Sequence, residues 1–229
     1  MRAGALLLSL ALTACIGHAP MGDAYIGARY MADPLGEDAG YDPDPLIRFD
    51  AFDCTTFVET VFAHGDIKKL NKIRYANGVV DFVHRNHFIE TDWIKNNAAY
   101  VENISARVAP TARRRVTIDR GAWMRKVHGM DDANPAKTVD LEYVPHANIP
   151  AGMRPRRPLV VLFIHDGVGM REKIGTDLAI THMGFLMPDG MLRHASSRAG
   201  YVLDENFDDY VAMRKKSRHN LGVMLLEIK

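Results

Sequence analysis

The order of elements along this chain predicts an α+β fold, with helices first and a consecutive antiparallel sheet last. Residues 53–64 carry apolar side chains at helical spacing. Residues 159–164 form a continuous apolar run, which is typical of a buried central strand. Two strand-like segments, 180–187 and 191–195, flank a Pro-Asp-Gly turn and predict a hairpin. Helical and strand segments are therefore segregated along the sequence, which is the α+β arrangement.

Length and composition indicate one globular domain. The 229 residues suffice for a single core, and 47% of them are hydrophobic. Residues 16–45 are rich in Gly, Pro, Asp and Ala, and Asp-Pro-Asp-Pro at 42–45 disfavours a helix. We therefore expect residues 15–45 to be a tether and residues 46–229 to be the folded domain.

The first fourteen residues predict a lipoprotein signal peptide, residues 1–14. Arg2 precedes an apolar stretch at 3–12, which is shorter than the roughly 20 residues of a membrane-spanning helix. The segment ends in Leu-Thr-Ala before Cys15 and resembles a lipobox, in which the cysteine becomes the lipidated first residue. A plain signal peptide with a stray cysteine is the alternative. Ile16 stands where an aspartate would resemble the inner-membrane retention signal, so we expect an outer-membrane lipoprotein that faces the periplasm.

The charge balance gives no reason to expect electrostatic binding of nucleic acid. Removing residues 1–14 takes Arg2 from the 29 Lys and Arg and removes no acid, which leaves 28 basic against 28 acidic residues. A neutral domain has no general attraction for a phosphate backbone, so we expect no nucleic-acid partner. Cys54 is then the one cysteine of the folded domain. A lone thiol in the oxidising periplasm is expected to be either buried or used.

The remaining elements follow from local patterns. Asp53 is a suitable N-cap for the first helix and Gly65 a suitable stop. Beyond it we expect helices at 66–76, 79–88, 92–104 (with a loop), 122–128 and 205–215, strands at 116–118, 141–144 and 221–228, and a glycine-containing loop at 167–177.

Cys54, His182 and His194 are the candidate catalytic residues. A thiol at a helix start feels about half a positive charge from unpaired amide groups, which favours the reactive thiolate. His182 and His194 lie twelve residues apart across the predicted turn, so a hairpin places them at similar heights. One imidazole can then act as base and acid, while the other holds its tautomer. A buried inert thiol and a zinc site of these three residues are the alternatives.

These motifs resemble those of a known superfamily of cell-wall hydrolases. Asp-Cys-Thr-Thr-Phe-Val at 53–58 resembles the nucleophile motif of the NlpC-type, papain-like enzymes. His182-Met-Gly-Phe-Leu and His194-Ala-Ser resemble their second and third motifs. The resemblance implies a papain-like fold, with Cys54 as nucleophile, His182 as general base and His194 as orienting residue. It also implies that a helical insertion, at about 66–157, separates the two halves of the site.

Four short runs in the insertion, Arg74-Tyr, Asn77-Gly, Arg85-Asn-His-Phe and Asp92-Trp-Ile, resemble the N-acetylmuramoyl-L-alanine amidase-like branch. These runs suggest substrate-binding residues. Arg85 could pair with a stem-peptide carboxylate, Asn86 could bond an acetamido group, and Trp93 could stack on a sugar. His87 belongs to the same run of residues, 85–88, and is a further candidate for contact with substrate. Each also has a structural alternative: a salt bridge between Arg85 and Asp92, a core position for Trp93 and a structural role for His87.

The expected function is amide hydrolysis in peptidoglycan or its fragments, through a thioester on Cys54. The branch implies cleavage between the muramyl lactyl group and L-alanine. The alternatives are cleavage between D-glutamate and the diamino acid, a wall-binding lipoprotein without activity, and an acyltransferase. No metal or organic cofactor is implied. The expected partners are the peptidoglycan or muropeptide substrate and the membrane, through lipidated Cys15; the oligomeric state is left open.

Overall fold

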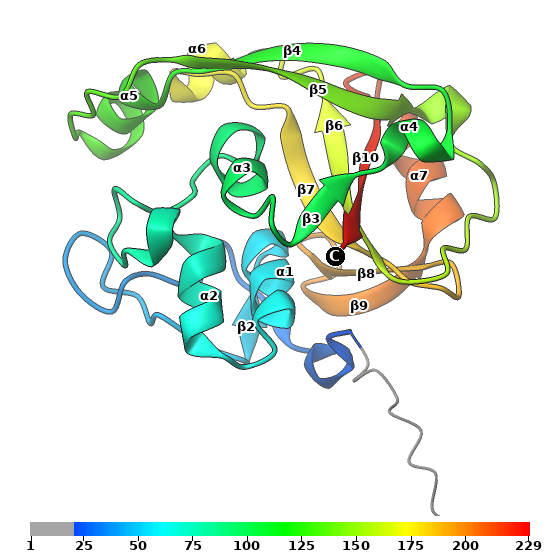
Figure 1. Cartoon of the computed structure of the whole chain (residues 1–229), viewed down its shortest axis with the longest axis horizontal. Helices are drawn as coiled ribbons and strands as arrows, with labels where there is room; N and C mark the ends of the chain where they lie inside the picture. The colour runs from blue at the N-terminus through cyan, green and yellow to red at the C-terminus, as the bar shows by residue number, and fades with distance from the viewer. Residues whose placement is uncertain (1–20) are drawn as a thin grey trace, which may run out of the picture.

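The computed structural model describes residues 21–229 (Figure 1). Its strands form a 10-stranded sheet in the order β2-β1-β9-β8-β7-β6-β10-β5-β4, with β3 paired to β10. The strands are β1 (Arg29–Tyr30), β2 (Ala51–Phe52), β3 (Val101–Asn103), β4 (Ala112–Ile118), β5 (Lys137–Pro145), β6 (Leu159–His165), β7 (Ile180–Leu186), β8 (Met191–Ser196), β9 (Tyr201–Asn206) and β10 (Asn220–Ile228). This sheet and its covering helices confirm the α+β class.

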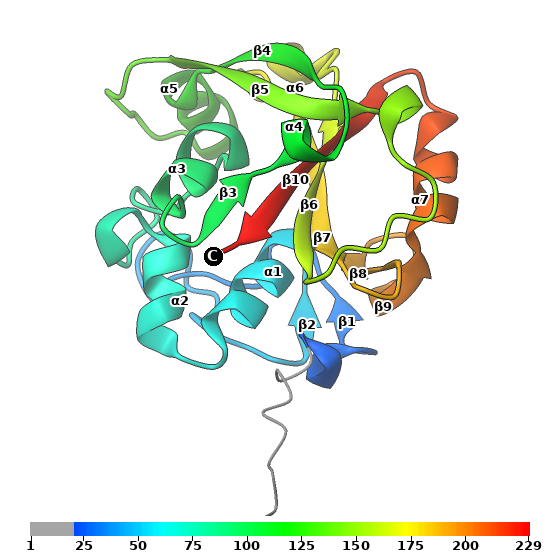
Figure 2. The same ribbon diagram turned by 45° about the vertical axis from the view of Figure 1, so that its right-hand side comes forward.

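The α-helices are α1 (Cys54–Ala63), α2 (Ile67–Arg74), α3 (Ile94–Asn96), α4 (Ser105–Val108), α5 (Arg120–Trp123), α6 (Met170–Ile174) and α7 (Phe207–Lys215). Short 3-10 or π turns occur at Asp23–Tyr25, Ala76–Gly78, Ile89–Trp93, Met124–His128 and His146–Asn148. Figures 1 and 2 show α1 and α2 on one face of the sheet and α7 on the other. No helix in the described part of the chain has the length and apolar character needed to span a membrane.

The continuous apolar run of β6 is explained by burial on both faces of the sheet. Val160 and Leu162 pack in the cluster that contains α1. Val161 and Phe163 pack in the second cluster, beneath α7. Alternate side chains of a strand point to opposite faces, so a strand covered on both faces is apolar throughout. The prediction of a central strand at 159–164 is confirmed.

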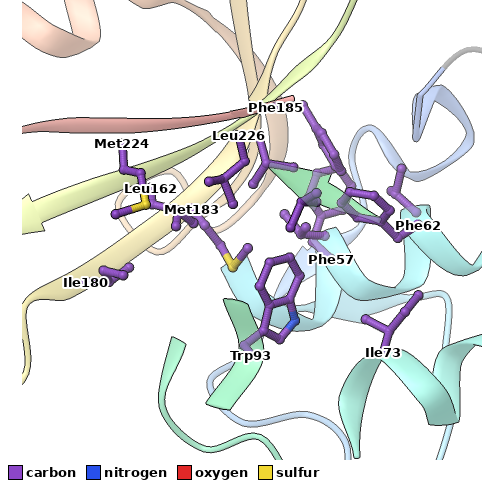
Figure 3. Close-up of a cluster of buried hydrophobic side chains, with 14 of the residues drawn as sticks. Phe57, Phe62, Ile73, Trp93, Leu162, Ile180, Met183, Phe185, Met224 and Leu226 are labelled. Atoms are coloured by element: carbon purple, nitrogen blue, oxygen red, sulfur yellow. The ribbon is translucent and has the colours of Figure 1, made fainter. Parts of the chain in front are cut away.

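The cluster beneath α1 fixes the position of that helix. Phe57 and Phe62 of α1 both pack against Phe185 of β7, with ring centroids 5.9 Å apart in each case (Figure 3). Trp93 closes the cluster against Phe62 at 6.3 Å. Full burial of one such side chain contributes about 1.5–3 kcal/mol. The helix that begins with Cys54 is thereby held against the strand that carries His182.

Three sequence expectations are corrected by the fold. Residues 21–45 belong to the folded domain, because β1 pairs with β2 and β9 and Leu35 is buried; residues 15–20 lie outside the described part. The segment 79–88 is not a helix, since Tyr75 forms a β-bridge with Arg85. The sheet is not fully consecutive, because β10 inserts between β6 and β5.

Several elements escaped prediction. The short elements β1, β2 and α4 had no predicted counterpart, and β3 lies within the segment 92–104, where a helix and a loop were expected. β9 pairs along the whole of β8, whereas residues 201–206 carried no predicted strand. The predicted loop at 167–177 contains the one-turn helix α6. The other predicted strands, and the helix expected at 122–128, are confirmed within their ranges.

Candidate active site

The start of α1 is fixed by a capping box. The Thr56 backbone N–H donates to Asp53 Oδ1 at 2.7 Å, and the Asp53 N–H donates to Thr56 Oγ1 at 3.0 Å. This reciprocal pair satisfies two of the backbone donors that a helix N-terminus leaves unpaired. Asp53 is therefore the N-cap that the sequence predicts, and Cys54 is the first residue of the helix.

The two predicted histidines meet on β7 and β8. His182 Nε2 and His194 Nδ1 are 2.6 Å apart, a hydrogen bond between the two rings. Gly184 explains the glycine of the His-x-Gly motif: a Cβ there would lie 2.8 Å from both the Arg193 carbonyl oxygen and the His194 Cβ. The two strands approach closely at this point only because residue 184 lacks a side chain.

Cys54 lies beside the residue that follows His182. The backbone of Met183 offers a hydrogen bond to the thiol, and α1 packs against β7. The nearest side-chain partner of the sulfur is Thr55 Oγ1, at 4.0 Å, and the thiol is hydrogen-bonded to neither histidine in this structure. The fold thus gathers all three predicted catalytic residues at one place, where the start of α1 meets β7 and β8.

Glu205 on β9 extends the pair of histidines, and the sequence did not reveal it. His194 Nε2 lies 2.9 Å from Glu205 Oε2, and the other carboxylate oxygen pairs with Arg198. The β8–β9 register places Leu203 opposite His194, so Glu205 lies two positions along on the same face. A prediction of β9 with its register would have found this residue.

Burial keeps the Cys54 thiol and the His182 ring uncharged at rest. It raises the pKa of the Cys54 thiol to about 11, with a smaller contribution from the Asp53 carboxylate. Burial, then the His194 ring and Arg214, hold the pKa of His182 well below 6.5. The expectation of an ionised resting thiol is therefore not supported, because loss of hydration outweighs the charge at the helix start.

Two tyrosines border the predicted catalytic residues. The Tyr210 ring of α7 lies 5.0 Å from the ring of His194 and 5.9 Å from that of His182. Burial raises the pKa of Tyr30, and the nearby Asp53 carboxylate, together with Cys54 where its thiol ionises, adds to this rise. Tyr30 belongs to β1, so the interpretation of this segment as a tether concealed it.

The structure places the predicted substrate-binding residues in different environments. Trp93 is 1% exposed and packs in the core, so the expectation that it stacks on a sugar is wrong. Arg85 donates to Glu37 at 2.8 Å and to Asp42 at 2.7 Å, and Asn86 donates to the Ile73 carbonyl at 3.0 Å. The donors of both are thus bonded within the protein, but both residues also line the cavity beside Cys54, so their contact with substrate stays a prediction. The alternative pairing of Arg85 with Asp92 is also wrong, because Asp92 pairs with Lys137.

An aromatic cavity lies beside Cys54. We give this name to the hollow of about 230 Å³ whose lining includes the rings of Phe82, His87, Trp123 and His128, the neighbours of Cys54 at 53 and 55, and the predicted substrate residues Arg85 and Asn86. The Trp123 ring lies 4.7 Å from that of His87 and 4.5 Å from that of His128. His87 donates to the Phe82 carbonyl at 2.7 Å, and burial lowers its pKa to about 3, so its ring is neutral. Contact of His87 with substrate stays a prediction.

A second hollow lies beside His182, on the α7 face of the sheet. This basic cleft has a volume of about 500 Å³ and is lined by Thr181, His182, Arg198, Tyr210, Arg214 and Lys216, among others. The predicted catalytic residues thus lie between two hollows of different character. The aromatic cavity borders the neighbours of Cys54, and the basic cleft borders His182.

One group of potential metal ligands lies apart from these residues. Ligand atoms of His165, Asp166 and His219 lie within 4.8 Å of one another. They already bond within the protein: the Gly167 N–H donates to His165 Nδ1 at 2.9 Å, and His219 Nδ1 bonds Asp166 at 2.8 Å. As for the zinc alternative, His182 Nε2 and His194 Nδ1 bond each other and do not converge on a shared point.

Comparisons with known proteins agree with this fold. The sequence model of the N-acetylmuramoyl-L-alanine amidase-like family matches residues 20–219. The crystal structure of a protein from Legionella pneumophila is 23% identical with a TM-score of 0.83, and the match covers 91% of this chain and 86% of that one. An N-acetylmuramoyl-L-alanine amidase from Bacteroides uniformis is also 23% identical, with a TM-score of 0.69 and coverage of 91% and 95%. At this identity the structures share the fold. No curated protein matches the chain.

Proposed function

We propose that this chain, which belongs to the N-acetylmuramoyl-L-alanine amidase-like family, hydrolyses the amide between the muramyl lactyl group and L-alanine in peptidoglycan or its fragments. The observation that carries the proposal is the hydrogen-bonded row of His182, His194 and Glu205, which lies beside the start of α1, where Cys54 is the first residue. We also assign the chain to the NlpC-type, papain-like superfamily, on its motifs around Cys54, His182 and His194.

The hydrogen-bond network determines which nitrogen of His182 can accept a proton. An ionised carboxylate only accepts hydrogen bonds, so Glu205 requires a proton on His194 Nε2. His194 Nδ1 is then an acceptor, and the N–H at His182 Nε2 donates a hydrogen bond to it. His182 Nδ1 is left with a lone pair. Glu205 thus fixes the tautomer of His182 indirectly, through two successive hydrogen bonds.

The proposed reaction uses that lone pair. After the Cys54 side chain rotates toward His182, Nδ1 takes the thiol proton as sulfur attacks the amide carbon. Backbone N–H groups at the start of α1 stabilise the oxyanion, a contribution of about 3–4 kcal/mol per donor. His182 then protonates the leaving amine, and the C–N bond breaks to leave a thioester. Water, deprotonated by His182, hydrolyses this thioester and restores the thiol.

The products test the choice of bond. Digestion of muropeptides by the wild-type protein is expected to release stem peptides that begin with L-alanine, and mass spectrometry identifies them. Fragments that begin with the diamino acid would instead indicate the endopeptidase alternative. Release of neither, from intact wall or from soluble fragments, would leave a wall-binding protein. Transfer of the acyl group to an added amine would identify the acyltransferase.

We further propose that the chain is an outer-membrane lipoprotein facing the periplasm, anchored through Cys15. The support is the sequence alone, since Cys15 lies outside the described residues. Each buried lipid methylene contributes about 0.8 kcal/mol, so several acyl chains give a firm anchor. Cells fed an alkyne-labelled fatty acid are expected to label the wild type and not Cys15→Ala. Equal labelling of both would refute the anchor, and recovery of the label in the inner-membrane fraction would refute the location.

A further inference from the structure

The basic cleft contains cations without matching acids. Arg198, Arg214 and Lys216 line it, together with the hydroxyl groups of Ser196 and Ser217. None of the described residues that line it is acidic. Of the three cations, Arg198 is paired with Glu205, the carboxylate that also bonds His194. The other two have no carboxylate within ion-pair distance among residues 21–229.

Arg214 is the unusual member of this group, because its guanidinium is held in place without a counter-ion. Its charged carbon lies over the rings of Phe163, at 5.2 Å, and Tyr210, at 6.0 Å. Nη2 donates to Thr181 Oγ1 at 3.0 Å, while the buried Nε has no hydrogen-bond partner. A partly desolvated cation with an unused donor is costly unless an anion pairs with it.

The chemistry of the proposed reaction determines which part of the substrate reaches this cleft. His182 must protonate the leaving amine, so the peptide that departs lies on the side of His182. His182 itself lines the basic cleft. The acyl part, with its sugar, then lies toward the aromatic cavity, which borders Asp53 and Thr55 beside the nucleophile. The two hollows therefore receive opposite ends of the scissile bond.

We infer that the basic cleft binds the free carboxylates of the stem peptide and that Arg214 pairs with the first of them, an inference that rests on the proposed function. A stem peptide linked through the γ-carboxyl of D-glutamate keeps the α-carboxylate of that residue. This group follows the leaving L-alanine directly. The planar guanidinium of Arg214 can receive it in two parallel hydrogen bonds. Substrates in which this carboxylate is amidated lose that pairing.

Binding to the inactive Cys54→Ala protein tests the inference without any turnover. The affinities of two dipeptides are measured by isothermal titration. The first is L-alanyl-D-glutamate whose γ-carboxyl is blocked as the methyl amide and whose α-carboxylate is free. The second is the same compound with the α-carboxylate also amidated. The acid is expected to bind at least about tenfold more tightly than the amide, as a charge-assisted hydrogen bond predicts. Arg214→Gln in the same background is expected to remove this preference and to leave binding of the amide within about twofold.

Lys215→Gln is the matched control. Lys215 is the next residue on α7, is exposed and does not line the basic cleft, so its replacement removes the same charge and should preserve the preference. Equal binding of acid and amide by the Cys54→Ala protein would overturn the inference, as would an equal effect of both substitutions. The proposed function fails separately, if the wild type releases no L-alanine-terminated peptide while the preference for the carboxylate persists.

Discussion

Replacing Cys54 by alanine is expected to abolish release of L-alanine-terminated peptides, with kcat/KM falling by a factor of about 10⁴ or more. In the proposed mechanism the thiol forms the bond to the acyl group, and alanine offers no atom that can replace it. What remains is binding and the oxyanion donors of α1. Quantitative mass spectrometry of the released peptides, with wild type and variant at equal concentration, measures the loss.

The fold of the Cys54→Ala protein should remain intact. The capping box at the start of α1 uses the side chains of Asp53 and Thr56 and none of the atoms of the thiol. An unfolding midpoint close to that of the wild type would show this. Cys54→Ser is the matched control for shape, and its weakly nucleophilic hydroxyl should also give little activity. A Cys54→Ala protein that keeps a tenth of the wild-type rate would refute the thioester mechanism.

The residues that could be predicted from sequence are those with local signals. Asp53 followed by helical spacing locates the start of α1, and the Pro-Asp-Gly turn places His182 and His194 at similar heights. Both features need only contacts between neighbouring segments. The structure confirms the cap and the hydrogen bond between the rings.

The residues that escaped prediction depend on pairing between distant segments. Glu205 reaches His194 only through the β8–β9 register, and Tyr30 reaches Cys54 only because β1 joins the sheet. The two tryptophans show the same limit. The local sequence does not distinguish the environments of Trp93 and Trp123, but tertiary packing buries the first and places the second in the aromatic cavity. The composition of residues 21–45 likewise gave no sign that this segment folds as part of the domain. Ion pairs of Glu37 and Asp42 with Arg85 help to hold the segment in place.

The uncharged resting state of Cys54 and His182 changes how the nucleophile is activated. With the pKa of Cys54 raised to about 11 and that of His182 lowered, the proton stays on sulfur at neutral pH. In the proposed mechanism, sulfur becomes a strong nucleophile only as His182 takes the proton, so the orientation of the base matters more than the charge at the helix start. Such a site depends strongly on the hydrogen bonds that orient His182.

Replacing the members of the relay one at a time is therefore expected to give losses that decrease with distance from sulfur. His182→Ala removes both base and acid and should lower kcat/KM by about 10⁴-fold. His194→Ala removes the acceptor that fixes the tautomer, a loss of about 10²-fold. Glu205→Gln leaves both rings in place and should cost about tenfold. His64→Asn, at the far end of α1, is the control for loss of a histidine and should leave activity unchanged.

The pH profile separates this relay from a merely structural role. The base must be neutral, so activity falls as pH drops through the pKa of His182, which burial, His194 and Arg214 hold below 6.5. His194→Ala removes one of these causes and admits water, so the pKa of His182 should rise. The acid limb of kcat/KM is then expected to move to higher pH in His194→Ala than in the wild type. An unchanged acid limb, or equal losses at all three positions, would refute the relay.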